Sequence, residues 1–120
     1  MTVSILLPTR KRISLLKKCT ESLLDNAHDP SKIQLLYGVD DDDQDTIDFL
    51  KDDKHPARSV IKFKRQGYEN LHLYNNALCS YAQGTWIMFF NDDAIMETKH
   101  WDLEINKFDG QFKLLKVKEQ

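Results

Sequence analysis

The 120-residue sequence has few cysteines and no long apolar run, and both absences narrow what the chain can be. Its two cysteines, Cys19 and Cys79, lie in segments with helical patterns, and neither belongs to a Cys-x-x-Cys pair. This favours buried, reduced thiols in a reducing compartment. The apolar run after Met1 is too short for a signal peptide or a membrane span. We therefore expect a cytoplasmic protein with no transmembrane segment.

The sequence also lacks a large net charge and the common glycine-rich motifs. Its formal net charge is -2, which argues against nucleic-acid binding through bulk positive charge. It contains neither a P-loop nor a Gly-x-Gly-x-x-Gly dinucleotide fingerprint, and no Ser-His-Asp or Cys-His arrangement can be argued. Hydrophobic residues make up 41% and charged residues 30%, as in ordinary globular proteins. With no repeat or long linker, residues 1–120 are predicted to form a single domain.

Short apolar runs alternate with segments of helical periodicity along the chain. Strands are predicted over residues 3–7, 33–39, 59–63, 86–90 and 112–117. Helices are predicted from an N-cap at Ser14 to about residue 26, over 46–52, over 71–82 with Gly84 as the stop signal, and around 101–108. This alternation predicts an α/β fold with a mostly parallel sheet and helices on both faces.

Three polar segments follow predicted strands, where ligands bind in sheets of this kind. They are TRKR at 9–12, DDDDQD at 40–45 and NDD at 91–93. In the last of these, Asp92 and Asp93 are adjacent carboxylates that repel each other at the end of a buried strand. A divalent cation such as Mg²⁺ or Mn²⁺ would neutralise them, with His100 as a candidate further ligand. The alternative is that both acids face solvent or cap the next helix.

The second acidic cluster, from Asp40 to Asp45, also allows two interpretations. It could be a solvated loop whose charges favour the dipole of the following helix. Alternatively, one of its acids could accept hydrogen bonds from a nucleobase or ribose. A calcium loop fits poorly, because Thr46 stands where the turn glycine belongs. Basic residues follow the first and third predicted strands, at Arg10 to Arg12 and at Lys64 to Arg65. They could be ordinary surface charge, or they could be the cations of a diphosphate pocket.

Together these segments resemble the N-terminal, nucleotide-sugar-binding half of family 2 glycosyltransferases, which have the GT-A fold. SILLPTRKR resembles the opening strand and its P-T-x-x-R loop, and LLYGVDDDDQDT resembles the second strand and its acidic turn. NNALCSYAQGTWIMFFNDD resembles the segment that ends in the acidic, DXD-like metal motif, with Asn76, Ala82 and Gly84 on its fixed points. The resemblance covers nearly all of the chain.

The resemblance implies a role for individual residues. Asp93, helped by Asp92, would bind the Mn²⁺ or Mg²⁺ that bridges the diphosphate of a UDP- or GDP-linked sugar. The base and ribose side of the pocket would be formed by Thr9, Arg10, Asp40 or its neighbour Asp41, Asn70 and Asn76. The family also favours inversion of stereochemistry in transfer to an acceptor, whose identity the sequence does not indicate.

The sequence departs from the family pattern in three ways. Arg10 occupies a position where the family often has tyrosine, and Asp42 and Asp43 replace the usual glycine and serine. Family members are also usually much longer, and only residues 94–120 follow the metal motif, where the acceptor site and catalytic base normally begin. None of the acids in this tail, Glu97, Asp102, Glu104, Asp109 and Glu119, has a spacing that marks it as a base.

Three functional hypotheses follow from these observations. The first is a metal-dependent glycosyltransferase, and the second is a non-catalytic remnant or accessory subunit that binds the nucleotide-sugar but lacks the acceptor half. A phosphoacceptor signalling domain fits poorly, because basic loops follow the first and third strands where that fold needs acids. An unpaired sheet edge would also favour a homodimer.

Overall fold

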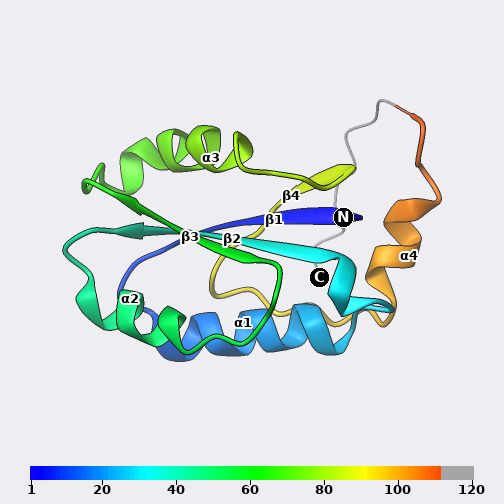
Figure 1. Ribbon diagram of the computed structural model, residues 1–120, viewed down its shortest axis with the longest axis horizontal. Coiled ribbons are helices and arrows are strands. Elements are labelled where there is room, and N and C mark those ends of the chain that lie inside the picture. Colours follow the sequence, from blue (N-terminus) through cyan, green and yellow to red (C-terminus); the bar gives the residue numbers. More distant parts are fainter. Residues whose placement is uncertain (112–120) are drawn as a thin grey trace.

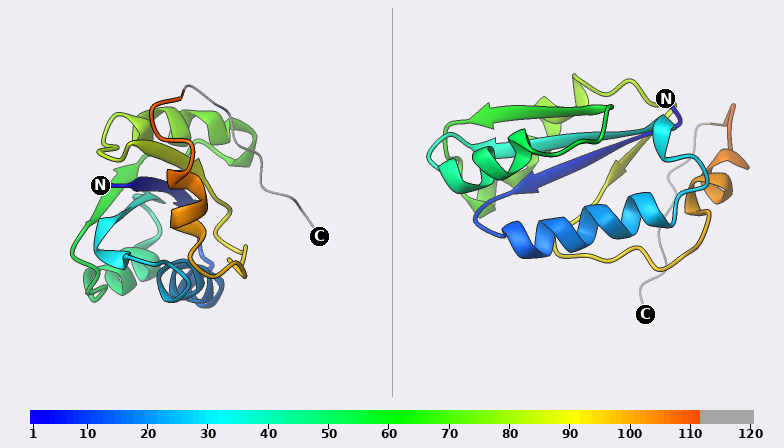
Figure 2. Two further views of the ribbon diagram at one scale, coloured as in Figure 1. Left: turned by 90° about the vertical axis from the view of Figure 1, so that its right-hand side faces the viewer. Right: turned by 60° about the horizontal axis from the view of Figure 1, so that its bottom comes forward.

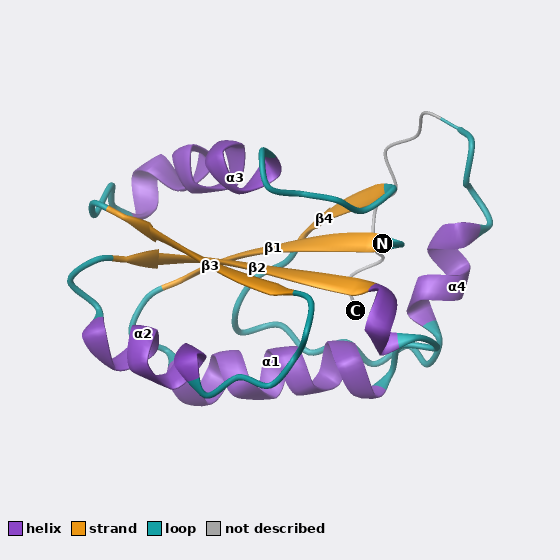
Figure 3. Ribbon diagram, viewed as in Figure 1, coloured by secondary structure: helices purple, strands orange, loops and turns teal. Residues whose placement is uncertain are grey.

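The computed structural model describes residues 1–111 and contains one four-stranded parallel sheet (Figures 1 and 3). Its strands are β1 (Val3–Thr9), β2 (Ile33–Asp40), β3 (Arg58–Phe63) and β4 (Trp86–Phe89), in the order β3-β2-β1-β4. Every pairing is parallel, which confirms the predicted sheet. The strand predicted over residues 112–117 lies outside the described residues.

Helices cover both faces of the sheet, as predicted. α1 (Ile13–Asp25) and α2 (Gln44–Lys51) lie along one face, and α3 (Leu71–Cys79) lies along the other (Figures 1 and 2). α4 (Trp101–Asn106) lies at the end of the sheet where the strands begin. Two short 3₁₀ helices, η1 (Pro30–Lys32) and η2 (Tyr68–Asn70), complete the described elements. No helix in residues 1–111 is long and apolar enough to cross a membrane.

The alternation of side chains along β1 and β2 divides the core into two layers. Ile5 and Leu7 on β1 and Leu35 on β2 belong to the larger cluster, which α1, α2 and Trp101 complete. The residues between them, Leu6 and Leu36, pack with Leu78 of α3 on the opposite face. All of these leucine and isoleucine side chains are fully buried, because these two strands are covered on both faces.

The outer strands are less protected than the central pair. β3 pairs only with β2 and β4 only with β1 within the described residues, so each has a free edge. On β4, Ile87 and Phe89 are 45% and 61% exposed although both are large and apolar. The predicted homodimer stays a prediction, for which these edges are candidate surfaces.

Two predicted boundaries at the first strand and helix were wrong. β1 continues past Pro8 to Thr9. The backbone nitrogen of Pro8 points toward β4, and the pairing of β1 with β4 has already ended at Leu6 and Phe89. A proline there leaves no ladder hydrogen bond unmade. α1 starts at Ile13 with Arg12 as its N-cap residue, and Ser14 is already inside the helix.

Gly84 does not stop α3, contrary to the prediction. α3 ends at Cys79, and Tyr81 and Ala82 follow in turns with hydrogen bonds to the third residue before them. A Cβ on Gly84 would lie 2.5 Å from the backbone nitrogen of Ser4. The glycine is therefore required by the close approach of this turn to β1, where its N–H donates to Ser4 Oγ at 2.8 Å.

Candidate functional site

The strand order brings the polar loops together at one edge of the sheet. β1 lies between β2 and β4, so the basic loop after β1 is flanked by the acidic loops after β2 and β4. α1 leaves β1 toward one face, whereas α3 covers the other face before the chain enters β4. Such a reversal of strand order opens a crevice beyond the carboxyl ends of the strands.

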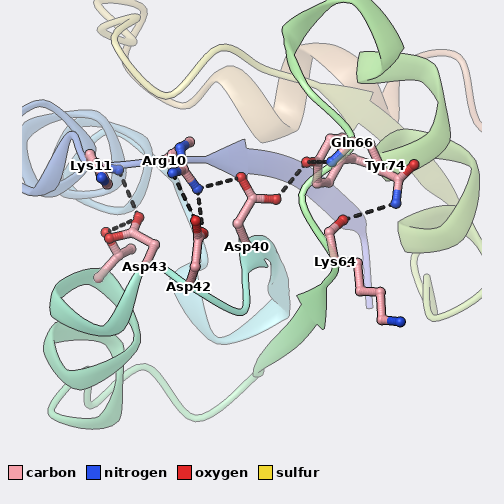
Figure 4. A network of polar contacts seen from close by, with 9 residues as sticks. Arg10, Lys11, Asp40, Asp42, Asp43, Lys64, Gln66 and Tyr74 are labelled. Carbon is pink, nitrogen blue, oxygen red and sulfur yellow. Dashed lines mark hydrogen bonds and ion pairs between the residues drawn. The ribbon is translucent and has the colours of Figure 1, made fainter.

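Asp40 lies at the centre of a hydrogen-bond network at the end of β2 (Figure 4). Its Oδ1 accepts a hydrogen bond from the Tyr74 hydroxyl at 2.5 Å, and its Oδ2 accepts one from Arg10 Nη1 at 2.9 Å. The Tyr74 hydroxyl also accepts a hydrogen bond from the backbone N–H of Gln66 at 2.8 Å. Burial, and then the hydrogen bond to Asp40, raises the pKa of Tyr74. The carboxylate is only 4% exposed but has a donor on each oxygen.

The two departures from the family pattern that were noted for this region are partners. Arg10 donates from both Nη atoms to the two carboxylate oxygens of Asp42, at 2.5 and 3.1 Å (Figure 4). The hydrogen bond from Arg10 is the main reason why the pKa of Asp42 is lowered, and it likewise raises the pKa of Arg10. The guanidinium is thus held beside Asp40 by a bidentate pair.

Asp43 has a structural role in joining the two loops. It is buried, and its Oδ2 accepts hydrogen bonds from the backbone N–H of Lys11 at 2.7 Å and from Thr46 Oγ1 at 2.6 Å. Lys11 has a positive φ of 51°, so the β1 loop turns sharply here. The acidic cluster therefore combines different roles, with Asp40 in the site and Asp43 in the support of the loop.

Asp92 and Asp93 at the end of β4 share one cation among the described residues. Arg12 Nη1 lies 3.3 Å from Asp92 Oδ1 and 3.6 Å from Asp93 Oδ2. Thr9 Oγ1 donates to the other oxygen of Asp92 at 2.9 Å. The Asp92 side chain is 10% exposed and that of Asp93 51% exposed. Arg12 thus offsets part of the negative charge of the acidic pair in this structure.

Two adjoining cavities open beside these residues, with volumes of about 230 and 200 Å³. The nucleoside-side cavity, as we call the first, is lined by Pro8, Thr9, Arg10, Arg12, Asp40, Arg65, Gly67, Tyr68, Leu71, Tyr74 and Asp92. The metal-side cavity is lined by Pro8, Arg12, Tyr68, Leu71, Asn75, Phe89, Phe90, Asn91, Asp92 and Asp93. Arg12 and Asp92 belong to both, so they mark the boundary between the cavities.

The predicted site residues divide into those that line a cavity and those that do not. Thr9, Arg10, Asp40 and Asp92 line the nucleoside-side cavity, and Asp92 and Asp93 line the metal-side cavity. The remaining predicted residues, Asp41, Asn70 and Asn76, are exposed and line neither. Their roles stay predictions.

Sequence reasoning overlooked several residues that the fold brings to the cavities. These are Tyr68, Tyr74 and Asn75, whereas Arg12 and Arg65, which also line a cavity, were already candidate cations of a diphosphate pocket. For Asn75 a signal was present, because it follows Leu71 at the i, i+4 spacing of one helix face. Its Oδ1 is buried without a hydrogen-bond partner in the described residues, so this cavity residue has an unused acceptor.

The other candidates lie away from the cavities. The His100 ring packs against the His28 ring, with centroids 5.3 Å apart. The backbone N–H of His100 donates to the carbonyl of Asn26, at the C-terminal end of α1 and away from the cavities. The buried Asp102 accepts hydrogen bonds from the backbone N–H groups of His28 and Asp29, which is a structural role. The other described tail acids, Glu97, Glu104 and Asp109, also line neither cavity.

The acidic pair fits a divalent cation whose coordination is completed by a ligand. Within residues 1–111, no group of three His, Cys, Asp or Glu side chains could hold a metal. Two carboxylates are nevertheless what Mg²⁺ commonly takes from a protein when substrate phosphates supply further oxygens. Asp93 is accessible to such an ion, and Asp92 faces both cavities.

Comparison with known proteins identifies the family. The profile of "Glycosyl transferase family 2" matches residues 4–113, so the chain belongs to this family. A search of curated proteins found no match. The fold is similar to that of S. aureus TarS 1–349, with a TM-score of 0.71 and 15% identity over 90% of this chain and 32% of that one.

The same fold recurs in ligand complexes of that protein. TarS 1–349 in complex with UDP-GlcNAc matches with a TM-score of 0.61 and 17% identity, over 78% of this chain and 27% of that one. The complex with UDP matches with a TM-score of 0.59 and 15% identity, over 78% and 28%. These likenesses show that the chain has a GT-A fold with a short sheet. The chain spans less than a third of the length of these structures.

Proposed function

We propose that the chain is the donor-binding domain of a glycosyltransferase and binds a nucleoside-diphosphate sugar across its two cavities. One observation carries this proposal: Asp40 and the Asp92–Asp93 pair lie on adjoining cavities at the edge where the strand order reverses. Asp40 in the nucleoside-side cavity suits the N–H and O–H groups of a base or ribose. Asp92 and Asp93 in the metal-side cavity suit a metal-bound diphosphate. Family membership and the nucleotide complexes of TarS support the same assignment.

Each lining residue has a defined part in donor binding. Asp40 would accept a hydrogen bond from the base or ribose, and Tyr74 and Arg10 hold its carboxylate in place. Asp92 and Asp93 would hold Mn²⁺ or Mg²⁺. When bound, this ion neutralises the charge that develops on the leaving nucleoside diphosphate. Arg12 and Arg65, which line the cavities, would bring further positive charge to the phosphates.

Transfer itself also needs a base that deprotonates the acceptor hydroxyl, with inversion as the outcome that the family favours. Asp40, Asp92 and Asp93 are the acids that line the cavities among the described residues, and all three have donor-side roles. Donor binding without transfer by this chain alone is therefore the second candidate function. Sugar transfer or donor hydrolysis by the purified 120-residue chain would exclude the binding-only alternative.

Calorimetry with UDP and with GDP, each with and without Mn²⁺, tests donor binding. We expect one of the nucleotides to bind, with higher affinity when Mn²⁺ is present. Asp93→Ala should abolish this metal dependence, whereas Asp45→Ala should not, because Asp45 is an exposed acid that lines neither cavity. Absence of nucleotide binding by the wild type would refute the proposal, and unchanged metal dependence in Asp93→Ala would refute the metal site.

A further inference from the structure

Arg12 occupies the carboxylate oxygens that a divalent cation would need. One guanidinium nitrogen, Nη1, contacts both Asp92 Oδ1 at 3.3 Å and Asp93 Oδ2 at 3.6 Å. Among the described residues, no other cation forms an ion pair with either acid. The arginine therefore reduces the repulsion between the two adjacent carboxylates by offsetting one of their two negative charges, whereas a divalent cation would offset both.

The two cations exclude each other from these oxygens. A guanidinium and a divalent ion repel, and hard metal ions approach carboxylate oxygens more closely than a hydrogen-bond donor does. Thr9 is no obstacle, because its hydroxyl is on the second oxygen of Asp92. A metal that binds Asp92 Oδ1 together with Asp93 Oδ2 must therefore break the Arg12 ion pairs.

Arg12 has space to move and a second partner within reach. Its side chain is 46% exposed, and it lines both cavities at their boundary. Its backbone is held at the start of α1, where its carbonyl accepts a hydrogen bond from the Leu16 N–H at 2.8 Å. The side chain can thus leave the carboxylates without unfolding the helix. The planar fork of an arginine also matches phosphate oxygens, to which it can donate two hydrogen bonds.

We infer that Arg12 is a resident counter-ion that a divalent cation displaces from Asp92 and Asp93 and that then binds the diphosphate of the donor. This inference rests on the proposed donor-binding function. It has a thermodynamic consequence: metal alone binds weakly, because it breaks the Arg12 ion pairs with no compensating contact. When a nucleoside diphosphate is present the displaced arginine has a new partner, so metal and nucleotide strengthen each other's binding by the same factor.

The first test is a calorimetric titration with Mn²⁺ in the absence of nucleotide. Arg12→Met keeps most of the side-chain length and removes the charge, and it should bind Mn²⁺ at least about fivefold more tightly than the wild type. Arg12→Lys keeps the charge and should stay near the wild type. Arg58→Met is the matched control, because Arg58 donates to the His55 carbonyl and lines neither cavity. It should leave Mn²⁺ affinity unchanged.

The second test repeats the Mn²⁺ titration at saturating UDP. The factor by which UDP tightens Mn²⁺ binding should fall at least about fivefold in Arg12→Met relative to the wild type and Arg58→Met. Circular dichroism establishes that each variant is folded. The displacement is overturned if Arg12→Met binds Mn²⁺ no more tightly than the wild type does. Absence of Mn²⁺ binding by both proteins overturns it as well. An unchanged UDP factor overturns the diphosphate contact.

The two proposals fail in different experiments. If the wild type does not bind UDP or GDP, the donor-binding function is wrong, and the diphosphate contact of Arg12 is wrong with it. The nucleotide-free Mn²⁺ titration still decides whether Arg12 competes with the metal. Conversely, metal-dependent UDP binding with equal Mn²⁺ affinities in the wild type and Arg12→Met would leave the donor-binding function standing and refute the displacement.

Discussion

Tyr74→Phe is the sharpest test of the network that holds Asp40 in the nucleoside-side cavity. The substitution removes one oxygen atom, which donates to Asp40 Oδ1 at 2.5 Å and accepts from the Gln66 N–H at 2.8 Å. The aromatic ring is kept, together with its edge-on contact to Phe63 at 4.9 Å between centroids. The perturbation is therefore confined to hydrogen bonding.

The expected loss can be worked out from these contacts. Asp40 is 4% exposed, so water cannot readily replace the lost donor, and a hydrogen bond to a charged group contributes about 1.5–3 kcal/mol. Gln66 is exposed, and water can satisfy its N–H at little cost. We expect the free energy of unfolding to fall by about 2 kcal/mol, which for a chain of this size lowers Tm by about 8 °C.

Urea unfolding monitored by circular dichroism measures this loss. Tyr68→Phe is the matched control, because Tyr68 is 83% exposed and the same atom is removed, so a change below about 0.5 kcal/mol is expected. A double-mutant cycle with Asp40→Ala, which removes the acceptor, should give a coupling energy above about 1 kcal/mol between Tyr74 and Asp40. If Tyr74→Phe costs no more than Tyr68→Phe, the hydrogen bond does not hold Asp40 and the reasoning is refuted.

Two other predictions concern the framework of the site. Gly84→Ala should lower the free energy of unfolding, measured in urea, by about 3 kcal/mol, because the new Cβ would lie 2.5 Å from the Ser4 backbone nitrogen. A loss below about 1 kcal/mol would contradict this close approach. Burial, and then the charges of Asp92 and Asp93, raises the pKa of Cys19 to about 12, so a thiol reagent at pH 8 should label Cys79 in the native protein but not Cys19. In the unfolded chain the Cys19 thiol has a pKa of about 8.5. The contribution of the neutral thiol to the free energy of unfolding is therefore complete below that pH and is lost as the pH rises toward the pKa of the folded protein. Unfolding free energies of the wild type and Cys19→Ala should therefore converge at high pH, and parallel pH profiles would contradict the assigned shift.

Periodicity was sufficient for the order and type of the elements. The apolar runs of β1 and β2 predicted buried strands, and their alternation with helices predicted a mostly parallel sheet. A parallel sheet in turn places every strand's carboxyl end at one edge. The meeting of the segments around Arg10, Asp40 and Asp92 could therefore be predicted without any side-chain position, and the structure confirms it.

Boundaries and individual side chains could not be predicted in the same way. Gly84 reads locally as a helix stop, but its reason is a contact with Ser4, which is far away in sequence. Of the two adjacent amides on α3, Asn75 lines the metal-side cavity and Asn76, to which the family motif pointed, does not. One residue along a helix turns a side chain by about 100°, so a motif match without the helix phase cannot say which amide faces the site.

The sequence by itself determined the fold class, the family resemblance and the presence of acidic and basic residues at one sheet edge, because these follow from the alternation of apolar runs with helical segments and from the order of short motifs. The tertiary structure alone decided which charge meets which. Arg10 pairs with Asp42, and Arg12 with Asp92 and Asp93, across about 30 and 80 positions of sequence. Ion pairs depend on distances of a few ångströms in space, and sequence separation carries no information about them. That Arg12 is the counter-ion of the two carboxylates after β4 therefore became evident only in the folded chain.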